Sequence, residues 1–215
     1  GIMFYALGNI RMVTMAAIVA PSLVPFFFHN VFGKHSKMFI GDAGTLSLGI
    51  VFSMFVATIL SVTPGAKLVA PTLGLVPFAL AVLCVPVFDT LRVMSARICR
   101  GHSPFHPDKT HLHHLFIELG FSHIGTTIAI ISANLMVVLS WFVAYRCGLS
   151  VDIQFYIVVA LGILITFIFY PFTKGQIRKE SAYYRFFHCL GEATQIKRTG
   201  FWLFLQKWVD KIANH

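Results

Sequence analysis

Residues 106–114 read HPDKTHLHH and bring together side chains that can bind a metal or an anion. His111, His113 and His114 stand at i, i+2 and i+3, three residues behind an acid, Asp108. A zinc site would need a closer match to known ligand spacings, and the chain contains neither HExxH nor CxxC. Imidazoles also donate hydrogen bonds to phosphate oxygens and stabilise negative charge. Two interpretations remain: a loop that binds phosphate, and a solvated loop without a function. The density of histidines favours the first.

Acids are scarce in the two polar stretches, 29–45 and 89–124, that interrupt the apolar runs of the chain. A charged side chain near a membrane is costly unless it is paired or bound to a metal. Each of these acids is therefore a candidate functional residue. They are Asp42, Asp89, Asp108 and Glu118.

Asp42 lies in KMFIGDAGTLSLGI, where a polar stretch gives way to an apolar run. Gly41 and Gly44 allow the backbone to turn tightly, and the first amides of the following helix can point outward. A carboxylate beside such amides can hold Mg²⁺ and a phosphate together. The alternative is an aspartate that only caps the helix, which is a common role at helix starts. The motif GDAG by itself does not decide between the two.

The second polar stretch begins within PVFDTLRVMSARICRGHS, and this motif carries three arginines. Arg92, Arg97 and Arg100 fall near one face if the helix continues past Asp89. With the histidines behind them they could bind anions, while Asp42 is placed for a divalent cation. The apolar surroundings suit a lipid partner. Together these residues favour transfer of a phosphate-containing group onto or off a lipid.

The composition of the whole chain is that of a membrane protein. Of its 215 residues, 57% are hydrophobic and 12% are charged, and the mean hydropathy is +0.77. Soluble domains carry about 25% charged residues. The net charge of +9 would suggest a nucleic-acid partner in a soluble protein. In a membrane protein, cytoplasmic loops beside anionic headgroups explain it, so we expect a membrane partner and no nucleic acid.

Several apolar runs are close to the ~20 residues that a helix needs to cross the hydrocarbon. The second and third are separated by SVTPGAK at 61–67, which predicts a short turn and a helical hairpin. The predicted fold class is an all-α, polytopic membrane bundle of about five helices with cytoplasmic loops. The expected spans are 12–28, 46–62, 68–88, 125–145 and 151–170.

Positive charge is sorted between the two sides of the membrane. Most of the 17 Lys and Arg residues fall in 29–45, in 89–124 or after Tyr170. By the positive-inside rule these segments are cytoplasmic. We predict a transmembrane transferase domain over 1–170, with active-site loops at 29–45 and 89–124, and a basic tail over 171–215. In the tail, TGFWLFLQKWVDKI is typical of an amphipathic helix in the headgroup region.

Three motifs, KMFIGDAGTLSLG, PVFDTLRVMSAR and SPFHPDKTHLHH, together resemble those of the polyprenyl-phosphate N-acetylhexosamine-1-phosphate transferases. The resemblance covers about residues 24–125 and is nearest to the bacterial, glycosyltransferase 4-like branch that transfers N-acetylglucosamine-1-phosphate to undecaprenyl phosphate. It implies an enzyme of the bacterial inner membrane, active on the cytoplasmic face, that takes a UDP-sugar and releases UMP. Its product would start a cell-surface polysaccharide such as that of lipopolysaccharide. The sugar stays open, with N-acetylglucosamine as the default, and so does the oligomeric state, with a homodimer as one option.

The resemblance also implies roles for individual residues. Asp42 matches a family aspartate that is implied to be catalytic and to bind Mg²⁺, with Mn²⁺ as an alternative, at the donor diphosphate. Thr45 stands where that family motif has a serine, and it keeps the hydroxyl. A family HxHH motif, implied to be catalytic through contacts with the phosphates or the sugar, is matched by His111, His113 and His114. Positions implied to bind substrate are matched by Asn30, Arg97 and Asp108.

One departure concerns the other half of the family's active site. N-terminal to the matched region, the family carries an adjacent pair of aspartates and several further spans, whereas this chain contains no adjacent aspartates. The chain begins GIMFYALGNI, without a Met, and is expected to be the C-terminal half of such an enzyme. The alternative function is a truncated, catalytically inactive membrane fragment of the family. An unrelated transporter would carry charges inside its spans, and the apolar runs contain almost none.

Overall fold

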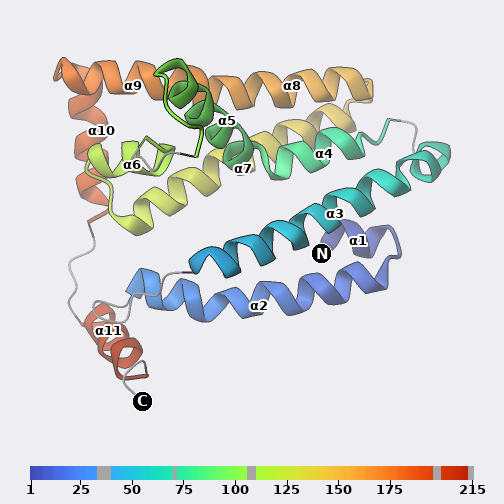
Figure 1. The fold of residues 1–215 in the computed structure, drawn as a ribbon, viewed down its shortest axis with the longest axis horizontal. Coiled ribbons are helices and arrows are strands. Elements are labelled where there is room, and N and C mark those ends of the chain that lie inside the picture. The colour runs from blue at the N-terminus through green and yellow to red at the C-terminus, as the bar shows by residue number, and fades with distance from the viewer. Residues whose placement is uncertain (33–39, 70–71, 106–109, 196–199, 213–215) are drawn as a thin grey trace. The chain divides into compact units, whose positions relative to one another are not determined.

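The computed structural model describes residues 1–32, 40–69, 72–105, 110–195 and 200–212, and every secondary-structure element in these ranges is a helix (Figure 1). Within the described chain, four helices are long and apolar enough to cross a membrane, or five if one bent pair is counted as a span. The predicted all-α, multi-pass membrane fold is therefore confirmed. The elements are α1 (Ile2–Ala6), α2 (Ile10–Phe32), α3 (Gly41–Val69), α4 (Leu75–Val82), α5 (Cys84–Cys99), α6 (Leu112–Glu118), α7 (His123–Arg146), α8 (Val151–Ile163), the π-helical η1 (Leu164–Ile168), α9 (Phe169–Arg178), α10 (Ala182–Ala193) and α11 (Phe201–Ile212).

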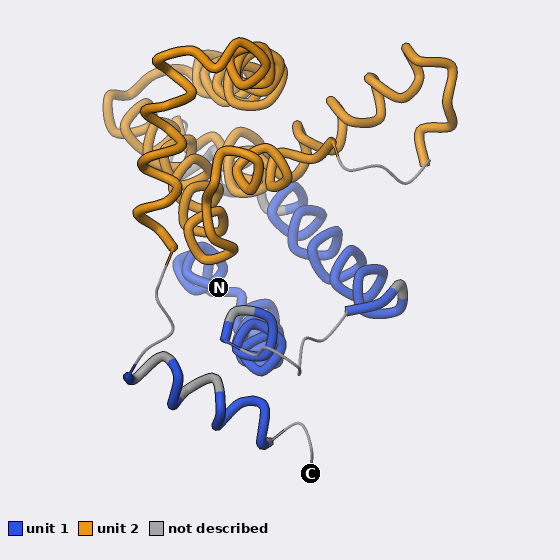
Figure 2. The backbone as a smooth tube through the Cα atoms, turned by 90° about the vertical axis from the view of Figure 1, so that its left-hand side faces the viewer, with its two compact units in different colours: residues 1–61, 197–215 blue, residues 62–196 orange. Residues whose placement is uncertain are grey.

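The chain forms two compact units, coloured separately in Figure 2. Unit 1 comprises residues 1–61 and 197–215, and so contains α1, α2, most of α3 and α11. Unit 2 comprises residues 62–196 and contains α4 to α10. Each unit is described by itself below.

Four predicted spans agree with helices of the structure to within a few residues, except at the end of the last one. That span continues past the predicted end at residue 170, because α8, η1 and α9 follow one another without a break. On α7, Ile131 is 60% and Met136 is 63% exposed, as expected of a helix whose outer face is covered by lipid. The four helical spans are Ile10–Asn30, Ala43–Ser61, His123–Arg146 and Val151–Arg178.

The third predicted span, 68–88, is wrong, because these residues do not form one continuous helix. Helix α3 continues through SVTPGAK to Val69, so no turn forms at 61–67. Proline and glycine are tolerated inside membrane helices, where a broken backbone would leave polar groups in hydrocarbon. The remaining apolar run is divided into α4 and α5, whose axes are bent by 69° on either side of Leu83.

Pro86 explains why the chain bends at this point. Proline has no N–H, so it cannot donate to the carbonyl of Val82 one helical turn earlier. Asn134 of α7 replaces the missing donor, because its Nδ2 lies 3.0 Å from the carbonyl oxygen of Val82. The Oδ1 of the same side chain accepts the backbone N–H of Val85 at 3.0 Å. One asparagine thus satisfies both sides of the bend and fixes the direction in which α5 leaves it.

Two glycines allow the helices that carry the polar loop to approach their neighbours closely. A Cβ at Gly162 of α8 would lie 2.7 Å from the ring of Phe88 and 2.9 Å from Sγ of Cys84, both on α5. A Cβ at Gly191 of α10 would lie 2.6 Å from the carbonyl oxygen of Leu119, at the end of α6. Helices α5 and α6 are therefore seated against α8 and α10 through positions that accept no side chain.

A helix, α11, forms where the tail was predicted to be amphipathic. In unit 1 it packs on α2, and Val209 is buried at 2% exposure while Trp208 beside it is 51% exposed. Its location in the headgroup region stays a prediction. The other part of the predicted tail belongs to unit 2, where Ser122, ahead of α7, donates from its backbone N–H to Oγ1 of Thr194 at 3.0 Å.

Candidate functional site

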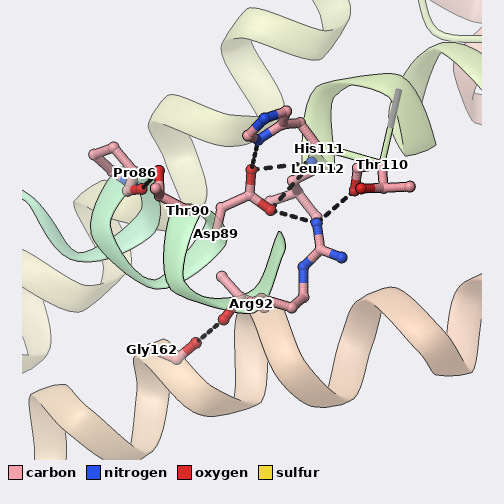
Figure 3. Close-up of polar contacts among 9 residues, drawn as sticks. Pro86, Asp89, Thr90, Arg92, Thr110, His111, Leu112 and Gly162 are labelled. Atoms are coloured by element: carbon pink, nitrogen blue, oxygen red, sulfur yellow. Dashed lines mark hydrogen bonds and ion pairs between the residues drawn. The ribbon is translucent and has the colours of Figure 1, made fainter. Parts of the chain in front are cut away.

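Asp89 lies on α5 where the segment that begins α6 folds back onto that helix (Figure 3). The residue is 8% exposed. Its Oδ1 lies 2.7 Å from Nη2 of Arg92, and its Oδ2 lies 3.0 Å from Nδ1 of His111. The backbone N–H of Leu112 lies 3.2 Å from both carboxylate oxygens. Arg92 and the backbone N–H of Leu112 donate to the carboxylate, and the ring of His111 donates to it in the tautomer that carries its proton on Nδ1.

Arg92 connects three segments of unit 2. It is 7% exposed, and its Nη2 donates to the carbonyl oxygen of Thr110 at 2.6 Å as well as to Asp89. Its guanidinium carbon lies 3.7 Å from the ring centroid of Tyr170 in α9, a cation–π contact. The arginine thereby holds α5, the start of the α6 segment and α9 in fixed relation.

The predicted histidines come together on and beside the first turn of α6. His111 precedes the helix as its N-cap residue, and its ring is stacked on that of His113, with centroids 6.0 Å apart. The rings of His113 and His114 are 4.0 Å apart. Burial lowers the pKa of His113 below the usual 6.5, and the neighbouring His114 and His111 lower it further against the opposing charge of Asp89. The cluster offers several imidazole nitrogens to an anion while disfavouring a positive charge on His113.

The opposite face of α6 is apolar. Leu112, Leu115 and Leu119 are each no more than 2% exposed. Leu112 and Phe116 also line a wholly apolar pocket of about 450 Å³, whose other walls come from α7, η1, α9 and Tyr183 of α10. The backbone N–H of Leu112 binds the carboxylate of Asp89, while its side chain lines the apolar pocket. Leu112 therefore lies between that carboxylate and a cavity that suits hydrocarbon.

The other predicted residues of this loop have different positions. Nη1 of Arg97, at the end of α5, donates to the carbonyl oxygen of Pro104 at 2.6 Å and so closes the turn that follows the helix. A role for Arg97 in substrate binding stays a prediction. Asp108 lies outside the described residues.

Asn30 and Asp42 belong to unit 1, whereas the histidines belong to unit 2. Nδ2 of Asn30 donates to the carbonyl oxygen of Phe26 in its own helix at 3.0 Å. Gly41 has a φ of +68°, which favours glycine and gives the sharp entry into α3 that the sequence predicted. The side chain of Asp42 lies outside the described ones, and its proposed task stays a prediction.

The sequence did not indicate that Asp89 and Arg92 pair with each other and hold the polar loop. Asp89 was one of four candidate acids without a role, and Arg92 was expected to face an anion together with Arg97 and Arg100. Arg92 instead turns inward to Asp89 and Tyr170. Their i, i+3 spacing on one helix is a signal that could have identified the pair. Nothing in the sequence indicated Tyr170 as its further partner.

Comparison with known proteins identifies relatives of this chain. No protein-family model matches the chain, and no solved structure matches it. The chain is 30% identical over 125 residues to the undecaprenyl-phosphate alpha-N-acetylglucosaminyl 1-phosphate transferase of Yersinia pestis, covering 57% of this chain and 32% of that protein. It is 33% identical over 113 residues to the decaprenyl-phosphate N-acetylglucosaminephosphotransferase of Mycolicibacterium smegmatis, covering 51% of this chain and 27% of that protein.

A longer match is with a probable undecaprenyl-phosphate N-acetylglucosaminyl 1-phosphate transferase of Bacillus subtilis. The two are 27% identical over 175 residues, which is 78% of this chain and 46% of the relative. The chain thus spans between about a quarter and about a half of the length of these three relatives.

Proposed function

We propose that this chain belongs to the family of polyprenyl-phosphate N-acetylglucosamine-1-phosphate transferases, which the names of its relatives support, and that the protein carries out that family's transfer. The donor would be UDP-N-acetylglucosamine, the acceptor undecaprenyl phosphate, and the products UMP and the lipid-linked sugar diphosphate. The observation that carries the proposal is the cluster of His111, His113 and His114, held on a buried Asp89 beside an apolar pocket.

The reaction is a transfer between two phosphates. An oxygen of the lipid phosphate attacks the β-phosphorus of the donor, so that a new P–O bond forms. The bond from that phosphorus to the bridging oxygen breaks, and UMP leaves with the bonding electrons. Such transfers depend mainly on positioning and on stabilising negative charge. His111, His113 and His114 would donate hydrogen bonds to the phosphate oxygens, and Arg97 would add a fixed positive charge.

Mg²⁺, or Mn²⁺ in its place, is proposed as the cofactor, and it would neutralise charge on the donor diphosphate when bound. Among the described side chains, no three His, Cys, Asp or Glu residues are grouped so that they could hold a metal ion. Asp89 is a poor ligand because both of its oxygens already accept hydrogen bonds. The proposed metal site therefore depends on Asp42, whose acidic side chain at the start of α3 suits a hard cation.

The lipid acceptor is supported by the two faces of α6. A polyprenyl phosphate has a charged head and a hydrocarbon chain, and α6 presents imidazoles on one side and borders an apolar cavity on the other. Asn30 and Asp108 are proposed to contact the donor. We place the site on the cytoplasmic face of the bacterial inner membrane, which the sorting of positive charge supports.

The test is release of UMP from membranes that contain the chain in the longest form its gene encodes. They would receive UDP-N-acetylglucosamine, undecaprenyl phosphate and Mg²⁺. Asp42→Asn is expected to lower the rate about a hundredfold or more, since it removes the charge that serves the transition state. Asp152→Asn is the matched control, because Asp152 is exposed in the first turn of α8 and should leave the rate unchanged.

Either of two results would contradict the proposal. Equal rates in Asp42→Asn and the wild type would leave Asp42 as a helix cap. Release that is absent with every UDP-N-acetylhexosamine tested, from correctly inserted protein, would support the catalytically inactive membrane protein instead.

A further inference from the structure

His111 is the member of the histidine cluster whose ring is held by a buried group. Its Nδ1 lies 3.0 Å from Oδ2 of Asp89, and the side chain of His111 is 33% exposed against 12% for that of Asp89. The ring of His111 is thus more exposed than the carboxylate that it contacts (the contact is drawn in Figure 3). We propose that Asp89 is the positioning residue of His111, fixing the proton on Nδ1 and leaving Nε2 for the substrate phosphate. The part of this inference that concerns substrate rests on the proposed function.

The carboxylate is itself fixed, which is what a positioning residue requires. Arg92 binds Oδ1 at 2.7 Å, and it is anchored in turn by the carbonyl of Thr110 at 2.6 Å and by the ring of Tyr170 at 3.7 Å. The backbone N–H of Leu112 bonds to both carboxylate oxygens. Rotation of Asp89 would break its contacts with Arg92, His111 and Leu112, so Oδ2 stays directed at His111.

The contact determines which nitrogen of His111 carries the proton. A carboxylate has no proton to give, so it is matched by Nδ1–H and not by a bare Nδ1. The neutral ring then has its lone pair on Nε2. When the ring takes a second proton, Nε2–H becomes a donor for a phosphate oxygen.

The tautomer can be measured without any assay of activity. Protein labelled with ¹⁵N-histidine would be reconstituted in lipid, and the His111 signals identified by their loss in His111→Gln. Nitrogen chemical shifts distinguish a protonated from an unprotonated ring nitrogen. We expect Nδ1–H in the wild type at a pH where His111 is neutral, and a mixture of the two tautomers in Asp89→Asn, whose amide can either donate or accept. Nε2–H in the wild type would overturn the inference, even if Asp89→Asn failed to fold.

A second measurement tests the consequence for turnover. In the UMP-release assay, Asp89→Asn is expected to lower kcat about ten- to a hundredfold, the range found when carboxylates that orient metal-binding histidines are lost. The KM for the UDP-sugar should change little, because Asp89 touches no substrate. His111→Gln should lower kcat at least as much, and the double variant should be no worse than His111→Gln. Losses that multiply in the double variant would show that Asp89 acts independently of His111.

The two measurements separate the possible failures. If the wild type releases no UMP, the proposed function fails, while the tautomer of His111 still decides whether Asp89 sets its proton. If UMP is released but the wild-type ring carries its proton on Nε2, the positioning role fails and the proposed function stands.

Discussion

The junction of α5 with α6 and the start of α3 both carry predicted active-site residues, but they are built in different ways. At the junction, the polar side chains are held by partners distant in the chain: Asp89 contacts His111, and Arg92 contacts Tyr170. In unit 1, Ser47 near the start of α3 donates to the carbonyl of Ala43 at 2.8 Å, and Asn30 on α2 donates to the carbonyl of Phe26 at 3.0 Å, each within its own helix.

The difference predicts where each region takes its geometry from. A hydrogen bond within one helix forms whenever that helix forms, so it adds little to the position of the helix. A buried carboxylate that receives three partners from other positions constrains the backbone of all of them, and its loss leaves donors unsatisfied. The stability of the protein should therefore respond strongly to single substitutions at the junction, and weakly to the loss of a hydrogen bond within one helix, such as that of Asn30.

The largest effect is expected from removal of the carboxylate of Asp89. Asp89→Ala would leave the buried guanidinium of Arg92 without its ionic partner, and breaking a buried ion pair in this way typically costs about 3–5 kcal/mol. Asn30→Ala removes one bond within a helix and should change stability by about 0.5 kcal/mol or less. The free energy of unfolding of the purified protein in mild detergent measures both.

Arg92→Leu provides a check on the origin of that loss. If the ion pair carries the effect, the double variant Asp89→Ala with Arg92→Leu should be less destabilised than the sum of the two single variants. Additive losses, or a cost for Asn30→Ala as large as that for Asp89→Ala, would remove the contrast between the two regions.

A second contrast concerns two helical glycines. Gly162→Ala would place a Cβ 2.7 Å from Phe88 and 2.9 Å from Cys84, forcing α5 away from α8 at a typical cost of about 1–3 kcal/mol. Gly49→Ala on α3 meets no atom within 4 Å and should be neutral or gain up to about 1 kcal/mol from helix propensity. Thermal unfolding of the two variants side by side tests this pair. Equal changes in the two variants would mean that the short contacts at Gly162 carry no packing cost of their own.

The contrast between local and long-range contacts also explains which features could be predicted from the sequence. The apolar runs predicted four of the spans because a helix crossing lipid needs about 20 apolar residues. The HLHH cluster and the turn at Gly41 were visible because their members are neighbours in the chain. The bend at Leu83 was not predicted, since it depends on Asn134 of α7 reaching the backbone of Val82 and Val85.

The role of Asp89 could be predicted only in part, for the same reason. Its spacing from Arg92 is local, but the contacts with His111 and Tyr170 arise from the packing of α6 and α9. Long-range packing of this kind leaves no periodic signal in a single sequence. The motif at the start of α3 was visible in the sequence, but it did not decide between a metal-binding and a capping role for Asp42.

The smallest effect is expected from pH and concerns His113. Its pKa is lowered in the folded protein by burial and by His114 and His111, with Asp89 opposing and His123 adding to the decrease. The unfolded chain, with a histidine pKa near 6.5, then binds more protons than the folded one between that value and the lowered pKa. Stability should therefore fall as the pH drops below about 6.5 and level off below the lowered pKa.

The melting temperature measured across that range provides the test of His113. His113→Gln removes the titrating ring and should flatten the part of the pH dependence that it causes. The effect is modest because solvent screens a ring that is partly exposed. Two results would contradict this prediction: an unchanged slope in His113→Gln, or a melting temperature that rises as the pH falls through 6.5. Either would show that a positive charge on His113 costs no more in the α6 cluster than in water.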